Sequence, residues 1–135
     1  MPLTEDRNTP RREGVELSIP MAANTTIFGG ALVMLNASGL ATRGAVATGQ
    51  RAVGVALERK TNGAVAGAER IRVAPGIYRF RNGTGADEIV QADVGAPCFI
   101  LDDDQVAKTN GGGTRSAAGT VIAVEPAGVW VRIGF

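Results

Sequence analysis

The last third of the chain consists of short segments in which apolar and polar residues alternate, joined by a glycine-rich connection. Residues 119–135 alternate around the run Val-Trp-Val-Arg-Ile at 129–133, and residues 102–115 contain the connection. A period of two is typical of strands with one buried face. No part of this stretch has the length of a helix, so it predicts strands joined by tight turns.

The rest of the chain follows the same pattern, with strand-length apolar runs at residues 31–35, 52–57, 69–73, 77–81 and 97–101. Hydrophobic residues make up 44% of the chain but aromatic residues only 4%, and there are 19 glycines, a balance that favours short strands and tight turns. Residues 87–95 are expected to form a turn or at most one helical turn. The sequence therefore predicts an all-β fold, a small antiparallel barrel or a β-tulip-like sandwich.

Two pairs of segments resemble each other. Residues 53–58, followed by 70–73, are similar to residues 120–125, followed by 129–133. In both pairs an apolar strand that ends in Glu precedes an alternating strand that carries Arg. The similarity is compatible with a barrel whose two halves use similar hairpins, and equally with chance similarity of composition.

The N-terminal residues have a different character from the rest of the chain. Residues 1–14 are polar, mixed in charge and interrupted by two prolines, which predicts an extended arm. Residues 15–19 alternate before Pro20, as expected for a strand at the domain's edge or paired with a neighbouring subunit. We divide the chain into an arm (1–20) and a β-rich domain (21–135); a disordered tail without contacts is the alternative. The candidate interface residues of the arm are Arg7, Arg11, Arg12, Val15, Leu17 and Ile19.

Trp130 is the only tryptophan and lies in an alternating strand, where either face of the sheet is open to it. It packs in the core in one interpretation and contacts a neighbouring molecule in the other. Burial of either kind contributes roughly 2–3 kcal/mol. Trp130 therefore joins the candidate interface residues.

The composition argues against an enzyme. Histidine is absent, which removes histidine-based catalysis and histidine metal sites. The one cysteine, Cys98, lies in an apolar run and is expected to be a small buried hydrophobe. No residue has a general base at a recognisable spacing, so we expect no catalytic site and no cofactor.

Charge and hydropathy argue against nucleic-acid and membrane partners. Fourteen basic and 13 acidic residues leave a net charge of +1, which gives no long-range attraction for an anionic polymer or surface. The uncharged residues 19–42 are interrupted by polar residues and glycines, which disfavours a transmembrane helix. The N-terminus lacks the apolar run of a signal peptide, so we expect a soluble protein made in the cytosol.

Three clusters have a simpler structural interpretation beside a functional one. The arginines at 70, 72, 79 and 81 form a basic patch if their two strands pair, and otherwise a solvated face balanced by Glu69, Asp87 and Glu88. Residues 102–104, three aspartates, lack the spacing of a calcium loop and are expected to form a solvated turn without metal. Residues 111–113, three glycines, lack the Lys-Ser/Thr ending of a phosphate-binding loop and are expected to be a flexible connector.

The run from Phe99 to Gly119, closing on residues 128–133, resembles small head proteins of Mu-like tailed phages and prophages, related to capsid cement or decoration proteins. The resemblance extends more loosely over residues 20–135, through 54–57 and 89–97. It implies a compact β-rich domain that binds the major capsid protein on the capsid exterior, as a homotrimer near threefold positions. The N-terminal residues 1–20 are longer than this resemblance leads us to expect.

The resemblance implies no active site and no residue-by-residue roles. It places the protein in the virion, after synthesis in the host cytoplasm, as a clamp on the capsid lattice. Another virion component, a head-tail connector or a tail protein, is the first alternative. A ligand-binding β module is the second, although Trp130 and Tyr78 are few aromatic residues for stacking on sugars.

Overall fold

A computed structural model describes residues 2, 4–8 and 16–134 of the chain. The described residues form an all-β fold with two short 3-10 turns, η1 (Gly85–Asp87) and η2 (Gln91–Asp93). The strands are β1 (Leu17–Pro20), β2 (Thr25–Ile27), β3 (Leu32–Leu35), β4 (Ala41–Arg43), β5 (Arg51–Ala56), β6 (Lys60–Asn62), β7 (Arg70–Ala74), β8 (Gly76–Phe80), β9 (Pro97–Asp102), β10 (Gln105–Ala107), β11 (Ala117–Glu125) and β12 (Gly128–Ile133). The predicted all-β class is confirmed.

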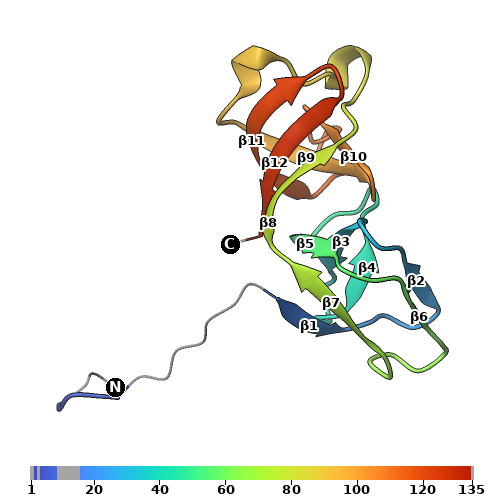
Figure 1. Ribbon diagram of the computed structural model, residues 1–135, viewed down its shortest axis with the longest axis vertical. Coiled ribbons are helices and arrows are strands. Elements are labelled where there is room, and N and C mark those ends of the chain that lie inside the picture. Colours follow the sequence, from blue (N-terminus) through green and yellow to red (C-terminus); the bar gives the residue numbers. More distant parts are fainter. Residues whose placement is uncertain (1, 3, 9–15, 135) are drawn as a thin grey trace.

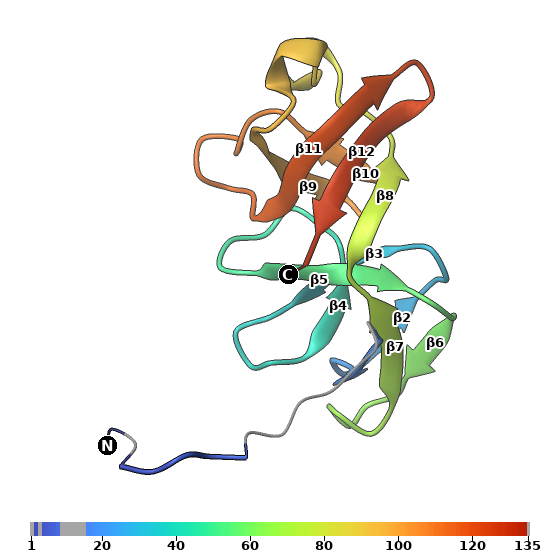
Figure 2. The ribbon, with the colours of Figure 1, turned by 60° about the vertical axis from the view of Figure 1, so that its left-hand side comes forward.

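The strands are arranged in two lobes (Figure 1). The first lobe contains a five-stranded sheet in the order β1-β7-β5-β3-β4 and the small β2-β6 ribbon. The second lobe contains a five-stranded sheet in the order β10-β9-β11-β12-β8. Only Pro75 separates β7 from β8, so one almost continuous segment passes from the first lobe into the second (Figure 2).

The two five-stranded sheets have the same strand order. When the five strands of each sheet are numbered along the chain, their order across the sheet is first, fifth, fourth, second, third. All neighbouring strands are antiparallel. In each lobe the residue after the first strand forms an isolated parallel bridge to the third strand: Met21 with Ala41, and Arg81 with Gln105. The two similar segment pairs of the sequence lie in the fourth and fifth strands of the two lobes, β5 with β7 and β11 with β12.

A glycine occupies the fourth strand of each sheet, where the fifth strand passes very close. A Cβ atom on Gly54 would collide with the carbonyl group of Ala74 in β7. A Cβ atom on Gly119 would collide with the carbonyl oxygen of Arg132 in β12. Glycine permits this close approach of two backbones, and the two sites occupy corresponding places in the repeated topology.

Each lobe has its own apolar core, because alternate residues of each strand point inward. In the first lobe Ile19, Ile71 and Val73 belong to this core, and in the second lobe Ile100, Val121 and Val131 do. Leu32, Met34 and Val55 come from the first lobe but pack in the second core, which joins the lobes. None of the sheets closes into a barrel. The two edges of each five-stranded sheet are joined by only one isolated bridge, and closure would require a continuous ladder of hydrogen bonds between them.

Local sequence signals predicted most of the connections. The turn at residues 36–39 joins β3 to β4, with the Asn36 side-chain oxygen accepting hydrogen bonds from the amides of Ser38 and Leu40. The aspartates at 102–104 join β9 to β10, as expected. Residues 87–95 contain the last residue of η1 and the whole of η2, in agreement with the prediction of a turn or at most one helical turn. In the part of the chain that the structure describes, no helix is long and apolar enough to cross a membrane.

Candidate interaction surfaces

The outer face of the second lobe carries apolar side chains that are open to solvent. Strands β8, β12 and β11 lie side by side, and successive side chains of each strand alternate between the core and this face. We call it the Trp130 face and define it by Ile77, Arg79, Thr120, Ile122, Trp130 and Arg132. Ile77 is 44% exposed and Ile122 is 37% exposed, whereas Val121, the neighbour of Ile122 in β11, is buried in the second core.

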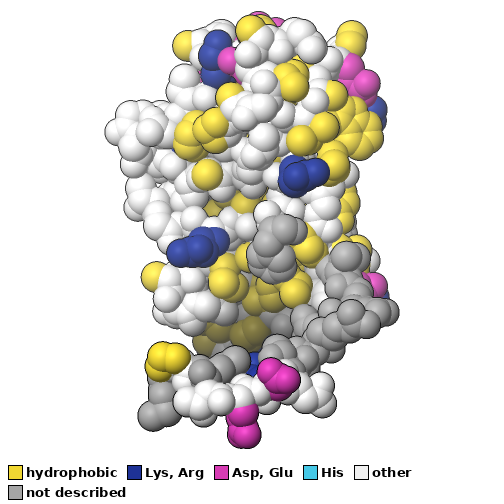
Figure 3. All heavy atoms as spheres, turned by 90° about the vertical axis from the view of Figure 1, so that its left-hand side faces the viewer, with side chains coloured by type: hydrophobic (Ala, Val, Ile, Leu, Met, Phe, Trp, Pro, Cys, Tyr) yellow, Lys and Arg dark blue, Asp and Glu magenta, His cyan; other side chains and the backbone are white. Residues whose placement is uncertain are grey.

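Trp130 lies on this outer face and belongs to neither core, so the core interpretation of this residue is wrong. It is half-buried, between the buried Val129 and Val131. The Arg79 guanidinium lies 5.8 Å from the centre of the indole ring, and its Nη1 atom is 3.1 Å from Glu125. Figure 3 shows hydrophobic side chains spread over the second lobe, with few charged side chains among them. Trp and Arg side chains of this kind are enriched at the centres of protein interfaces.

The outer face of β7 in the first lobe is polar, and its arginine side chains have hydrogen-bond or ion-pair partners. There β7 carries Arg70 and Arg72, both exposed. Arg70 donates hydrogen bonds of 2.9 and 2.8 Å to the side chain and carbonyl of Ser18, and Arg72 lies between Glu16 and Glu58. Because two sheets of the same topology differ so strongly on this face, the fold itself does not require an apolar surface there.

The four arginines of β7 and β8 do not form one patch. The two strands belong to different sheets, so the pairing on which that hypothesis depended does not occur. Arg79 pairs with Glu125, and Arg81 forms a two-pronged contact with Asp104 at 2.8 and 3.0 Å. Each arginine therefore contacts a local acceptor, as expected for a solvated face. The carboxylates that balance Arg72, Arg79 and Arg81 are those of Glu58, Glu125 and Asp104, and not the expected Glu69, Asp87 and Glu88.

The β9–β10 turn collects negative charge. The carboxylates of Asp102, Asp103 and Asp104 lie within 4.8 Å of one another. The contact with Arg81 lowers the pKa of Asp104, whereas burial and the neighbouring Asp102 raise the pKa of Asp103. Within the described residues neither Asp102 nor Asp103 forms an ion pair. The predicted solvated turn is present, and Arg43 lies near enough to Asp103 to oppose the rise of its pKa without forming an ion pair.

A hollow of about 290 Å³ borders this turn on the side of the first lobe. It is lined by Phe28, the backbone of residues 29–31, Asp103 and Asp104. Phe28 is 47% exposed, and Arg59 lies over its ring at 5.6 Å from the ring centre. We call this region the Phe28 hollow. It combines an accessible aromatic ring with unpaired negative charge.

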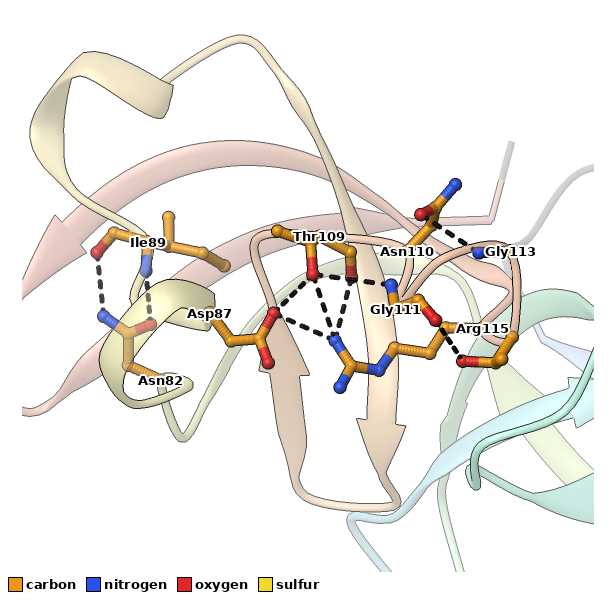
Figure 4. A network of polar contacts seen from close by, with 9 residues as sticks. Asn82, Asp87, Ile89, Thr109, Asn110, Gly111, Gly113 and Arg115 are labelled. Atoms are coloured by element: carbon orange, nitrogen blue, oxygen red, sulfur yellow. Dashed lines mark hydrogen bonds and ion pairs between the residues drawn. The ribbon is translucent and has the colours of Figure 1, made fainter.

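The glycine-rich connection is an ordered turn, and the flexible connector that the sequence predicted is wrong. The carbonyl of Asn110 accepts hydrogen bonds from the amides of Gly113, Thr114 and Arg115. The Arg115 Nη1 atom donates to the Asp87 carboxylate at 2.9 Å and to the Thr109 carbonyl at 3.0 Å (Figure 4). These amides are bound within the turn, which leaves them unavailable for a phosphate group.

The contacts of Asp87 fix this turn to η1. Hydrogen bonds from Arg115 and then from Thr109 lower the pKa of the Asp87 carboxyl. The Thr109 hydroxyl donates to Asp87 at 2.6 Å. Nearby, Asn82 forms two hydrogen bonds of 2.8 Å with the backbone of Ile89. The drawn contacts of this network join residues of the second lobe to one another (Figure 4), and the buried Arg115 Nε atom has no hydrogen-bond partner.

Cys98 is buried in the second core, where burial raises its pKa from 9.0 to about 12. We predict that iodoacetamide modifies the native thiol far more slowly than the unfolded one, since the shift lowers the thiolate fraction by about a thousandfold. Mass spectrometry of timed samples, with and without denaturant, measures the two rates. Equal rates would show that the second core opens readily.

The predicted interface residues of the arm have different locations. Arg7 is exposed, whereas Arg11, Arg12 and Val15 lie outside the described residues. Leu17 and Ile19 belong to β1, which pairs with β7 in the first lobe, and Ile19 is 8% exposed. The segment forms the edge strand of the first sheet, as one of its two expected roles required. Sequence reasoning missed Phe28, for which only its position before two glycines gave a signal.

Comparison with protein-family models, with curated proteins and with solved structures found no match to this chain. The surfaces described above are therefore the basis for a functional proposal.

Proposed function

We propose that this chain is a capsid decoration protein, a β-tulip-like sandwich with an N-terminal arm. It acts by binding the outer surface of a phage capsid, as a trimer near threefold positions, and stabilises the major-capsid lattice without catalysing a reaction. The observation that carries the proposal is the Trp130 face, an apolar outer surface on one lobe that is polar on the other. The resemblance of residues 99–119 and 128–133 to phage head proteins gives the class of partner.

Several features of the molecule support a structural role. Two lobes share Leu32, Met34 and Val55 in one core, so the molecule presents its surfaces in a fixed relation. Near-neutral net charge suits a protein that packs in many copies on one shell. The three aspartates of the β9–β10 turn are the one cluster of metal-ligating side chains that the described ranges contain. Nothing about that cluster indicates catalysis.

The Trp130 face provides a direct test of the proposal. We expect the Trp130→Ala variant to bind expanded capsids of the cognate major capsid protein about tenfold or more weakly than the unaltered protein. Co-sedimentation with capsids measures binding, and electron microscopy of the particles locates the bound copies. Arg70→Ala, the change at the corresponding position of the first lobe, is the matched control and should bind normally.

The location of the bound copies separates the alternatives. A decoration protein occupies many equivalent lattice positions, whereas a head-tail connector occupies a single vertex. Failure of the unaltered protein to bind capsids, or binding at one vertex only, would contradict the proposal. A ligand-binding module would instead bind a soluble ligand as an isolated monomer.

Removal of residues 1–14 tests the arm separately. We expect this truncation to weaken capsid attachment while the melting temperature stays unchanged, because the first described strand of the body begins at Leu17. Capsid co-sedimentation and a thermal melt measure the two effects. Full occupancy by the truncated protein, with the same melting temperature, would show that the arm does not tether the domain.

A further inference from the structure

We propose that the Trp130 face of one copy binds the Phe28 hollow of a second copy, with Arg132 facing Asp102 and Asp103. The inference rests on the proposed function only for the number of copies in the assembly, which is taken to be three. The pairing of the two surfaces follows from their own charge, shape and exposure.

The first of these surfaces offers an unpaired cation beside apolar side chains. Arg132 is exposed on β12, next to Ile77 in the register of β8 and next to Thr120 in that of β11. No ion pair or hydrogen bond of its guanidinium occurs within the described part of the chain, in contrast to Arg72 at the corresponding position of the first lobe. A free guanidinium beside Ile77 and Trp130 suits a partner that offers carboxylates and apolar surface.

The Phe28 hollow offers the complement. Asp103 lines it, Asp102 is adjacent, and both carboxylates lack an ion pair within the described ranges. Burial and the neighbouring Asp102 raise the pKa of Asp103 although Arg43 opposes them, so an incoming guanidinium would relieve the remaining electrostatic cost. The exposed ring of Phe28 gives the incoming apolar side chains a surface to cover.

The Phe28 hollow and the Trp130 face lie at different places on one molecule. The hollow has a volume of about 290 Å³, and the Trp130 face is the outward side of a sheet. The surfaces have no residue in common, so a contact between them leaves one free surface on each of the two copies. Such a head-to-tail contact closes into a ring if the rotation between neighbours allows it. Three copies in the ring would match the trimer of the proposed function, and Trp130→Ala would then weaken capsid binding by breaking the trimer.

Charge reversal tests the contact in solution, without capsids. Analytical ultracentrifugation over a concentration series measures self-association of the full chain. We expect the unaltered protein to associate, and Arg132→Glu or Asp103→Lys alone to weaken association by about tenfold or more. The combined variant, Arg132→Glu with Asp103→Lys, restores the opposite charges and should recover most of the association.

Arg51→Glu is the matched control, because Arg51 is another exposed arginine that forms no ion pair within the described residues. It changes the net charge equally, yet it lies on β5 of the first lobe and should associate normally. Thermal melts of all variants establish that each one is folded.

The ultracentrifugation results distinguish the contact between copies from the trimer and from capsid attachment. A monomeric unaltered protein, normal association of Arg132→Glu, or failure of the combined variant to recover association would overturn the contact. A dimer that responds to the charge reversals as expected would keep the contact and contradict the trimer of the proposed function. Loss of association with normal capsid binding would separate the two surfaces from capsid attachment.

Discussion

Replacing Gly119 with valine should destabilise the protein by about 3 kcal/mol or more, because the new side chain has no space. Its Cβ atom would overlap the carbonyl oxygen of Arg132, which belongs to the backbone of β12 and cannot rotate away. Relief requires β11 and β12 to separate, and this pair forms the centre of the second sheet. The free energy of unfolding, measured by urea titration, gives the effect directly.

The matched control is Gly63→Ala. Gly63 follows β6 in the first lobe, and a Cβ atom there would meet no atom within 4 Å. Its substitution should change the free energy of unfolding by less than about 0.5 kcal/mol. If Gly119→Val were as stable as this control, the close approach of β11 to β12 would not exist in solution.

Replacing Asn62 with alanine should cost about 3 kcal/mol, since it leaves buried carbonyl groups without a donor. Asn62 is 1% exposed. Its side-chain nitrogen donates to the carbonyls of Met21, Ala22 and Val65 at 3.1, 3.0 and 3.0 Å. These bonds attach the end of β6 to the segment that follows β1. Loss of the side chain should therefore lower the melting temperature of the whole first lobe.

Thr61→Ala provides the comparison for this prediction. Thr61 is the neighbour of Asn62 in β6, but its hydroxyl is exposed and bonds to Thr26 across the ribbon at 3.0 Å. Water can replace that bond, so we expect a change of about 0.5 kcal/mol or less. Equal melting temperatures for the Asn62→Ala and Thr61→Ala variants would refute a structural role for the buried amide.

The sequence predicted the strands and their hairpins well, because alternation and turn residues are local signals. It did not predict how the strands divide into sheets. Residues 69–73 and 77–81 looked like neighbours in one sheet, yet β7 and β8 lie in different lobes. Pro75 and Gly76 between them permit either a hairpin or a passage from one sheet to the next, and only long-range packing decides between these two outcomes.

The candidate surfaces were predicted only in part. Trp130 was identified as a possible interface residue, but alternation cannot tell which face of a strand is buried when both faces carry large side chains. Val129, Val131 and Ile133 occupy the inner face, and Trp130 with Arg132 therefore faces outward. The Phe28 hollow combines residues 28–31 with residues 103–104, and no sequence pattern connects segments so far apart.

The strand order has a consequence for how the chain folds during synthesis. Every strand of the first lobe finds its hydrogen-bonding neighbours before Pro75, so that sheet can assemble while the later residues are still in the ribosome. Leu32, Met34 and Val55 then offer a prepared apolar platform on which β8 to β12 condense. The halves of the polypeptide would thus mature in succession, the earlier one serving as a template for the later.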